Sequence, residues 1–153
     1  MSRASLAAPS LALALLLAPP LAAQETFRLV VDGASEVRER TAGGDVSGHL
    51  TLVPRLEGEG LAEAKAFRIR VTGAKDDTGA SVLPEEPVAT AWSESASGEG
   101  LRLRLASPAR GASAVTVSGS VDLWLPKRDP SRGVPTKKST VSVPFEMKDV
   151  PLP

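Results

Sequence analysis

The chain has 153 residues, and its 18 Lys and Arg balance its 18 Asp and Glu, so the formal net charge at pH 7 is zero. Such a balance gives no overall attraction to nucleic acid or to a membrane surface, and we expect no nucleic-acid partner. The chain contains no cysteine, which excludes a disulfide scaffold, a cysteine-ligated metal and a cysteine nucleophile. Its fold must therefore rely on the hydrophobic core.

The first two dozen residues differ from the rest of the chain. Arg3 is the only charged residue before Glu25, and an unbroken run of Leu and Ala occupies positions 11–17. A basic start, an apolar run too short to span a bilayer and a small-residue exit predict a signal peptide over residues 1–23, cleaved near Ala23. We therefore expect a bacterial exported protein, periplasmic or extracellular, with one domain over residues 24–153 and no transmembrane segment after cleavage.

Alternation of apolar and polar residues predicts that the domain begins with a β-strand. This first strand covers Thr26–Asp32 and ends at Gly33. The polar segment Ser35–Thr41 is interpreted as an edge strand or a loop. Ala42–Asp45, with two glycines, predicts a turn.

The next strand is predicted to place Leu50 and Leu52 in the core. Pro54 cannot donate a backbone hydrogen bond, so it confines this strand to an edge or lies near its end. The segment Leu61–Ala66 contains good helix formers but is too short to nucleate a helix alone. We interpret it as an extended lead-in to the following strand.

Residues Ala66–Leu83 are the best-specified part of the chain. They predict a strand, a tight turn over Gly73–Gly79 and a second short strand at Val82 and Leu83. The first of these strands has two distinct faces, with Phe67, Ile69 and Val71 on one and Arg68 and Arg70 on the other.

Four more segments continue the strand pattern. Val88–Glu94 places Trp92 on the face of Val88 and Thr90, and Ser95–Gly100 predicts a turn. The later strands alternate in the same way, and their apolar rows are Leu101, Leu103 and Leu105; Val115, Val117, Val121, Leu123 and Leu125; and Val141, Val143, Phe145 and Met147. Gly119 interrupts the longest row where a bulge or bend would fit. Pro144 places the last strand at an edge, and the tail Val150–Pro153 has no periodic signal.

Seven or eight short strands with regular turns predict an all-β sandwich of two antiparallel sheets, immunoglobulin-like in architecture but without a disulfide. A small β-barrel is the alternative. The segment Asp76–Pro84, the Leu-x-Leu strand, Ser107-Pro108 and Val117–Val121 together resemble a pattern in uncharacterised exported bacterial β-sandwich modules. This resemblance covers half of the mature chain and implies architecture and export, with no activity.

His49 is the only histidine, and a hydrolase that pairs it with a Ser and an Asp is one functional hypothesis. However, the chain has neither a Gly-x-Ser-x-Gly nor a Ser-x-x-Lys motif. By strand alternation His49 also points away from the core face of Leu50 and Leu52. We therefore expect a surface histidine, and a protein that is not an enzyme.

Asp76 and Asp77, with Glu85 and Glu86, supply oxygen atoms of the kind that bind calcium. Their spacing lacks the alternating carboxylates of a calcium loop, and aspartates also stabilise tight turns by accepting backbone hydrogen bonds. We interpret the pair as turn residues and expect no metal or other cofactor.

Two surface features are candidates for binding. The first is a basic loop over residues 126–138, which includes the single acid Asp129 and the cations Lys127, Arg128, Arg132, Lys137 and Lys138. The second is Trp124, which alternation places with Asp122 and away from the core row. The four arginines at 68, 70, 102 and 104 form a further basic stripe if their strands are neighbours and no acid neutralises them.

The main functional hypothesis is an exported, non-catalytic module with a structural or binding role in the envelope. The alternative is a binder of an acidic protein or anionic polymer through the basic loop and Trp124. A solvated hairpin loop explains the same charges. The sequence leaves the partner and the oligomeric state open.

Overall fold

The computed structural model describes residues 27–40, 42–44, 46–94 and 101–153. These residues form seven strands and two short 3-10 helices: β1 (Phe27–Arg40), β2 (Val46–Gly58), η1 (Glu59–Glu63), β3 (Ala66–Asp76), β4 (Val88–Ala89), β5 (Leu103–Ala106), β6 (Ala114–Trp124), η2 (Pro126–Arg128) and β7 (Thr140–Pro151). Within these ranges no helix has the length and apolar character needed to cross a bilayer. The predicted signal peptide and the predicted turn at Ser95–Gly100 lie outside the described residues.

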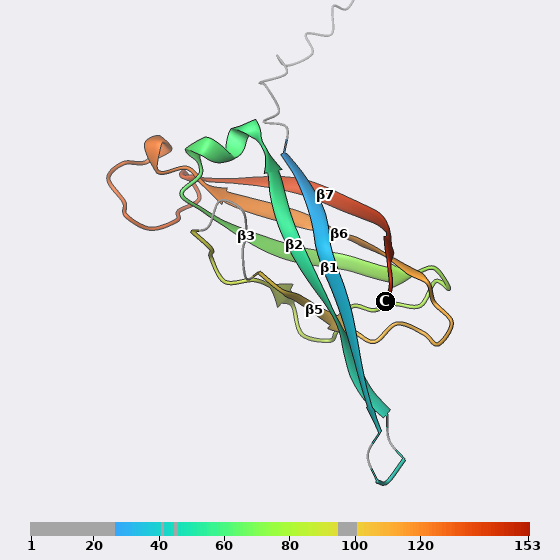
Figure 1. Cartoon of the computed structure of the whole chain (residues 1–153). Helices are drawn as coiled ribbons and strands as arrows, with labels where there is room; N and C mark the ends of the chain where they lie inside the picture. Colours follow the sequence, from blue (N-terminus) through green and yellow to red (C-terminus); the bar gives the residue numbers. More distant parts are fainter. Residues whose placement is uncertain (1–26, 41, 45, 95–100) are drawn as a thin grey trace, which may run out of the picture.

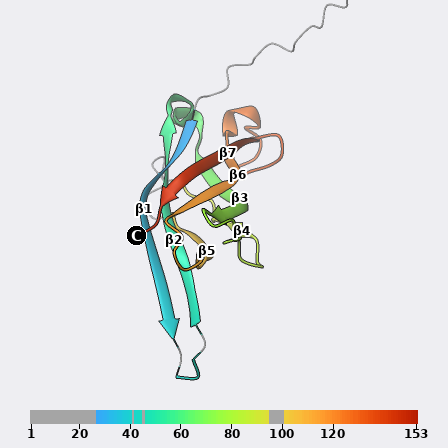
Figure 2. The ribbon, with the colours of Figure 1, turned by 90° about the vertical axis from the view of Figure 1, so that its right-hand side faces the viewer.

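The strands make two antiparallel sheets, as predicted. One has the order β1-β2-β5 and the other the order β4-β3-β6-β7. In Figure 1 the strands of the first sheet cross in front of those of the second, and Figure 2 shows the two sheets as separate layers. No pairing between described strands joins the sheets, so the closed barrel that we considered as an alternative is not formed.

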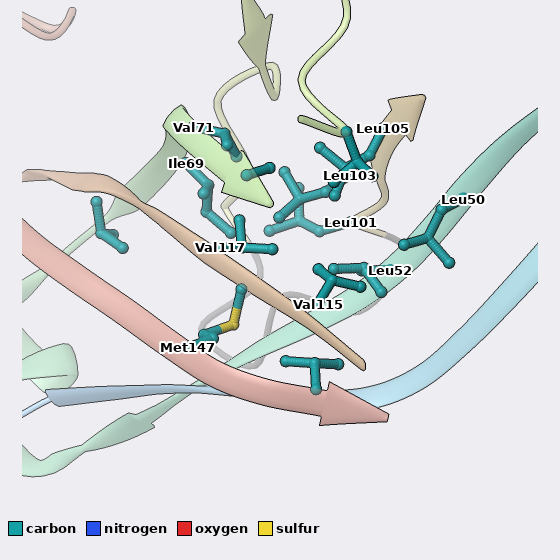
Figure 3. Packing of buried hydrophobic residues seen from close by; sticks show 14 of the residues in the cluster. Leu50, Leu52, Ile69, Val71, Leu101, Leu103, Leu105, Val115, Val117 and Met147 are labelled. Carbon is teal, nitrogen blue, oxygen red and sulfur yellow. The ribbon is translucent and has the colours of Figure 1, made fainter. Parts of the chain in front are cut away.

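One hydrophobic core lies between the sheets. Leu50 and Leu52 from the first sheet and Ile69 and Val117 from the second belong to this core (Figure 3), and all four are completely buried. Burying each such side chain stabilises the fold by roughly 1.5–3 kcal/mol. The apolar rows predicted by alternation are confirmed as buried at Phe67, Ile69, Val71, Leu101, Leu103, Leu105, Val115, Val117, Val121, Leu123, Leu125 and Met147.

The prediction that the first strand ends at Gly33 is wrong. β1 continues to Arg40, and its register against β2 shifts between Val31 and Gly33. The extra residue of such a bulge changes which alternate positions face inward: Leu29 and Val31 pack on the core before it, and Ala34 does so after it. The alternation interrupted at Gly33 thus resumes one residue out of phase.

The segments at the two ends of β3 also differ from expectation. Residues 61–63, expected to be extended, belong to the 3-10 helix η1, in which Ala64 N–H donates to the carbonyl of Leu61 at 3.1 Å. The predicted turn at Gly73–Gly79 is shorter than expected, because β3 continues through a bulge to Asp76. The chain then reverses at Gly79, whose φ of 87° favours glycine.

Pro144 is at a sheet edge, as predicted, but the expectation for Pro54 is only partly met, because β2 is the central strand of its sheet and continues past Pro54 to Gly58. Pro144 lies in β7, the outer strand of its sheet. Pro54 lies beyond Leu52, the last residue of β2 that pairs with β5. The tail without a periodic signal is more ordered than expected, because β7 extends to Pro151 and Val150 is buried. The strand expected over Val88–Glu94 is shorter than expected, since β4 has two residues.

The β1-β2 hairpin extends well past the body of the protein. Its far end projects beyond β5 and beyond the second sheet in both views (Figures 1 and 2). β5 pairs with β2 only from His49 to Leu52, so the outer part of the hairpin is a two-stranded ribbon. Arg38 joins this ribbon to the body by donating from Nη2 to the carbonyl of Pro108 at 3.0 Å.

Candidate functional site

A buried carboxylate lies on the outer face of the four-stranded sheet. Asp122 is on the face of β6 that points away from the core, yet it is only 1% exposed. Arg68 is directly opposite Asp122 on β3 and donates from Nε and Nη2 to Oδ2 at 3.2 and 2.8 Å. Arg70 donates from Nη2 to Oδ1 at 2.9 Å. A single carboxylate therefore holds two guanidinium groups.

These contacts keep Asp122 ionised. Burial raises the pKa of the Asp122 carboxyl, while hydrogen bonds from Arg68, Arg70 and Ser142 lower it and prevail, so its pKa lies below the ordinary value. Ser142 is opposite Asp122 on β7. At neutral pH the carboxylate is charged and acts as a fixed anchor for both arginines.

Trp92 supports the first of these arginines from the edge of the sheet. The guanidinium carbon of Arg68 lies 4.9 Å from the centre of the Trp92 ring, within the range of a cation–π interaction. The neighbouring Ser93 pairs with Phe67 through two backbone hydrogen bonds of 2.9 Å, which fixes Trp92 beside β3. Arg68 is thus held by a carboxylate on one strand and by an aromatic ring on another segment.

An open hollow of about 420 Å³ lies over these side chains. Its charged lining residues are Arg68, Arg70, Lys137 and Asp122. Three cations and one anion give the hollow an excess of positive charge, which favours an anionic ligand. The remaining lining residues are Trp92, Pro135, Thr136, Thr140 and Ser142.

The basic loop closes one side of the hollow and is ordered by its own hydrogen bonds. Ser139 is completely buried; its Oγ accepts from Thr136 N–H at 2.9 Å, and its carbonyl accepts from Leu125 N–H at 2.7 Å. Asp129 accepts from Ser131 Oγ at 2.6 Å. This Ser131 hydrogen bond, with lesser help from Thr136 and nearby cations, lowers the pKa of Asp129 despite partial burial. The only acid of the loop is therefore engaged within the loop.

The cations of the basic loop are distributed around this hollow unequally. Lys137 is exposed and lines it, while Lys127 extends to Glu63 with an Nζ to Oε1 distance of 3.6 Å. Arg128, Arg132 and Lys138 are exposed to solvent. The structure thus brings one of the five predicted cations to the two arginines of β3, and their role in binding remains a prediction.

Trp124, the predicted contact residue, is half-buried on the outer face of β6. It lies opposite Ala66 on one side and Thr140 on the other. Its Nε1 is buried and has no hydrogen-bond partner among the described residues. Trp92, also half-buried, is the tryptophan that lines the hollow.

The other pair of arginines is on the other sheet. Arg104 is in β5 and Arg102 immediately precedes that strand; because β3 and β5 are not neighbours, the four arginines do not form one stripe. His49 is half-buried, and its Nδ1 lies 3.0 Å from Arg104 Nη2. Since arginine can only donate, Nδ1 accepts and the ring proton is on Nε2. His49, Arg102 and Arg104 line a second open hollow of about 550 Å³.

Asp76 and Asp77 stabilise loops. Asp76 is buried and accepts from Thr78, Ala80 and Ala109, the last at 2.8 Å. Asp77 accepts from Ser113 N–H and Oγ. Hydrogen bonds, led by that of Thr78 at Asp76 and that of Ser113 at Asp77, lower the pKa of both carboxyls. In the described residues no three His, Cys, Asp or Glu gather as a metal site would require.

Sequence reasoning missed Asp122 and Trp92 as members of this surface. A signal for Asp122 was present, because it is the only acid on a strand face that otherwise carries Thr116, Ser118, Ser120 and Trp124. Its pairing with β3 was not readable from the chain.

A scan against family models matches no family, and searches of curated proteins and of solved structures find no match.

Proposed function

We propose that the protein is an exported, non-catalytic β-sandwich module of the bacterial envelope, and that it binds an anionic partner. The binding surface comprises the basic loop 126–138 and the outer face of β3, β6 and β7. The observation that carries this proposal is the convergence of Arg68, Arg70 and Lys137 on one open hollow, in which Asp122 is the single carboxylate among the described lining residues. Guanidinium groups suit such a role because their donors match the geometry of oxyanions.

The strand order supports an immunoglobulin-like architecture for this module. The order β1-β2-β5 corresponds to strands A, B and E of such sandwiches, and β3-β6-β7 corresponds to C, F and G. The short β4 pairs with β3, so the fourth strand is on the C, F, G sheet here. Sandwiches of this kind occur in many cell-surface domains, where the function depends on the site and not on the fold.

The bonding of the ionisable residues favours binding over catalysis. Asp122 accepts from two arginines and His49 accepts from Arg104. A general base needs a free lone pair directed at the substrate proton. The two carboxylate oxygens of Asp122 and Nδ1 of His49 instead accept hydrogen bonds from guanidinium groups.

Export is tested by the N-terminus of the protein recovered from the envelope fraction. Cleavage near Ala23 is the expected result in mass spectrometry of the intact chain. Recovery of the full chain in the cytoplasmic fraction would contradict export.

Binding is tested by capture of partners from an envelope extract at low and high salt. A loop variant, Lys127→Glu with Arg128→Glu and Lys138→Glu, should lose the partner, and high salt should release it from the natural protein because exposed charge contacts are screened. A control with three reversals at exposed positions outside this surface, Arg40→Glu, Arg102→Glu and Arg110→Glu, should retain it. Equal capture by the loop variant and the natural protein would overturn the proposal.

A further inference from the structure

We propose that the hollow beside Arg68 and Arg70 is an anchor site for a carboxylate side chain of an acidic protein segment. This inference rests on the proposed function and deepens it, because it names the group that the surface recognises and the residues that hold that group. The basic loop then supplies general attraction, and the hollow supplies specific contact.

The first argument is the difference in exposure between the carboxylate and its arginines. The Asp122 side chain is 1% exposed, whereas those of Arg68 and Arg70 are 32% and 49% exposed. The carboxylate is therefore beneath the guanidinium groups, which are open to solvent on their other side. Each guanidinium carries five N–H donors. Among the described residues Arg70 donates to Asp122 through Nη2 alone. Most of the N–H donors of Arg70 therefore remain available.

The second argument is that the two arginines are already ordered. Binding with a long side chain normally costs about 0.5–1.5 kcal/mol for its lost rotamer freedom. Here the bonds to Asp122 fix both guanidinium groups, and the ring of Trp92 fixes that of Arg68. An arriving carboxylate meets donors that need little further ordering.

The third argument concerns the balance of charge. Asp122 neutralises one of the two arginines, and Lys137 adds a further cation to the lining. One additional carboxylate is therefore attracted without leaving the hollow negatively charged. The hydroxyl group of Thr140, which also lines it, is a suitable donor for its second oxygen.

A protein segment fits this site better than an acidic polysaccharide. Arg68 already covers one face of the Trp92 ring, and aromatic faces are what sugar rings stack on. The hollow contains no second aromatic residue among its described lining. Its volume of about 420 Å³ falls in the range of small ligand pockets and accommodates an acidic side chain whose main chain remains outside.

The test measures binding of a labelled oligoglutamate peptide to the full exported protein by fluorescence anisotropy. Arg70→Gln should weaken binding about tenfold, the loss expected for a charge-assisted hydrogen bond. Arg70→Lys keeps the charge but not the planar fork, and should also weaken binding severalfold. Arg102→Gln, which removes the same charge from the other sheet, is the matched control and should change binding less than twofold. Equal effects of Arg70→Gln and Arg102→Gln would overturn the inference.

A second readout reports on the hollow itself. In a Trp124→Phe variant, Trp92 is the only remaining tryptophan, and its emission should change as oligoglutamate binds. No change at saturating peptide would overturn the site. Tighter binding of polygalacturonate or polyphosphate than of oligoglutamate would overturn the assignment to an acidic protein segment.

The outcomes also separate this inference from the proposed function. If the envelope partner is lost by the loop variant but retained by Arg70→Gln, the anionic-partner function stands and the anchor site is refuted. If the loop variant retains the partner, the proposed function itself fails, whatever the effect of Arg70→Gln.

Discussion

Arg68 and Asp122 are directly opposite each other on neighbouring strands, and two nitrogens of the arginine donate to one oxygen of the carboxylate. The two residues are 54 positions apart in the chain. Arg70 completes the arrangement from the next outward position of β3. The stability of this cluster and the positive surface above it therefore depend on a single side chain.

Replacing that side chain should destabilise the fold. Asp122→Asn removes the charge that both arginines contact, and we expect a loss of about 2 kcal/mol in the free energy of unfolding. This is less than the roughly 3–5 kcal/mol for a fully buried pair, because the arginines regain water. Urea unfolding at neutral pH measures it. Glu146→Gln, at an exposed position paired with Lys148, is the control and should change stability by no more than about 0.5 kcal/mol.

Stability should fall in acid. The folded state lowers the pKa of Asp76, Asp77, Asp122 and Asp129 below the ordinary value of 3.8. The stabilisation by each carboxylate is thus present above pH 3.8 and is lost as the pH falls through the lower folded-state pKa. Unfolding free energies measured from pH 7 to pH 2 should show this decline.

Asp76 offers the sharpest check of this pH dependence, since its side chain accepts from three other residues. Asp76→Asn should lower stability at pH 7 and make the acid decline shallower. Glu85→Gln, at an exposed loop position, should leave the decline unchanged. A decline of the same steepness in Asp76→Asn would show that this carboxylate is not one of its sources.

Gly119 should not tolerate a side chain. A Cβ at this position would lie 2.0 Å from the backbone oxygen of Arg70, which cannot move without disturbing β3. We expect Gly119→Ala to cost at least about 2 kcal/mol, in the range for an overpacked core. A Cβ at Gly33 would meet no atom within 4 Å, and this glycine has no positive φ, so thermal unfolding of Gly33→Ala provides the control. Similar melting temperatures for the two variants would contradict the close approach.

A core truncation tests the interface between the two sheets. Leu52 is completely buried and pairs with Leu103 of β5, so Leu52→Ala should cost about 2–5 kcal/mol. Val37, on the projecting hairpin, is 40% exposed, and Val37→Ala should cost well under 1 kcal/mol. Denaturant midpoints compare the stability of the two variants. Equal losses of stability would show that Leu52 is not part of the core.

Strand faces were predictable where alternation is strict and uninterrupted. Ile69 and Leu103 are in such runs, and both are completely buried. The prediction that the strand ends at Gly33 failed, because a bulge shifts the phase of alternation. In the sequence this shift cannot be distinguished from the end of a strand. Prediction failed again at Leu61, because a single 3-10 turn is stabilised by local contacts too few to leave a periodic pattern.

The candidate site was only partly predictable for a different reason. The cations of the basic loop are evident from composition, and alternation places Arg68 and Asp122 on outward faces. What brings these two together is the register between β3 and β6, which the long-range packing of the core determines. The same packing decides that Trp92, and not Trp124, lines the hollow beside them.

The projecting β1-β2 hairpin has a consequence for how the molecule opens. Beyond Arg38 its strands pair only with each other, and an isolated two-stranded ribbon is marginally stable in water. Its amide hydrogens should therefore exchange with solvent long before those of β3 and β6, through local openings that leave the core folded. A protease that cuts the ribbon would divide the chain into two fragments that remain held together by the folded core.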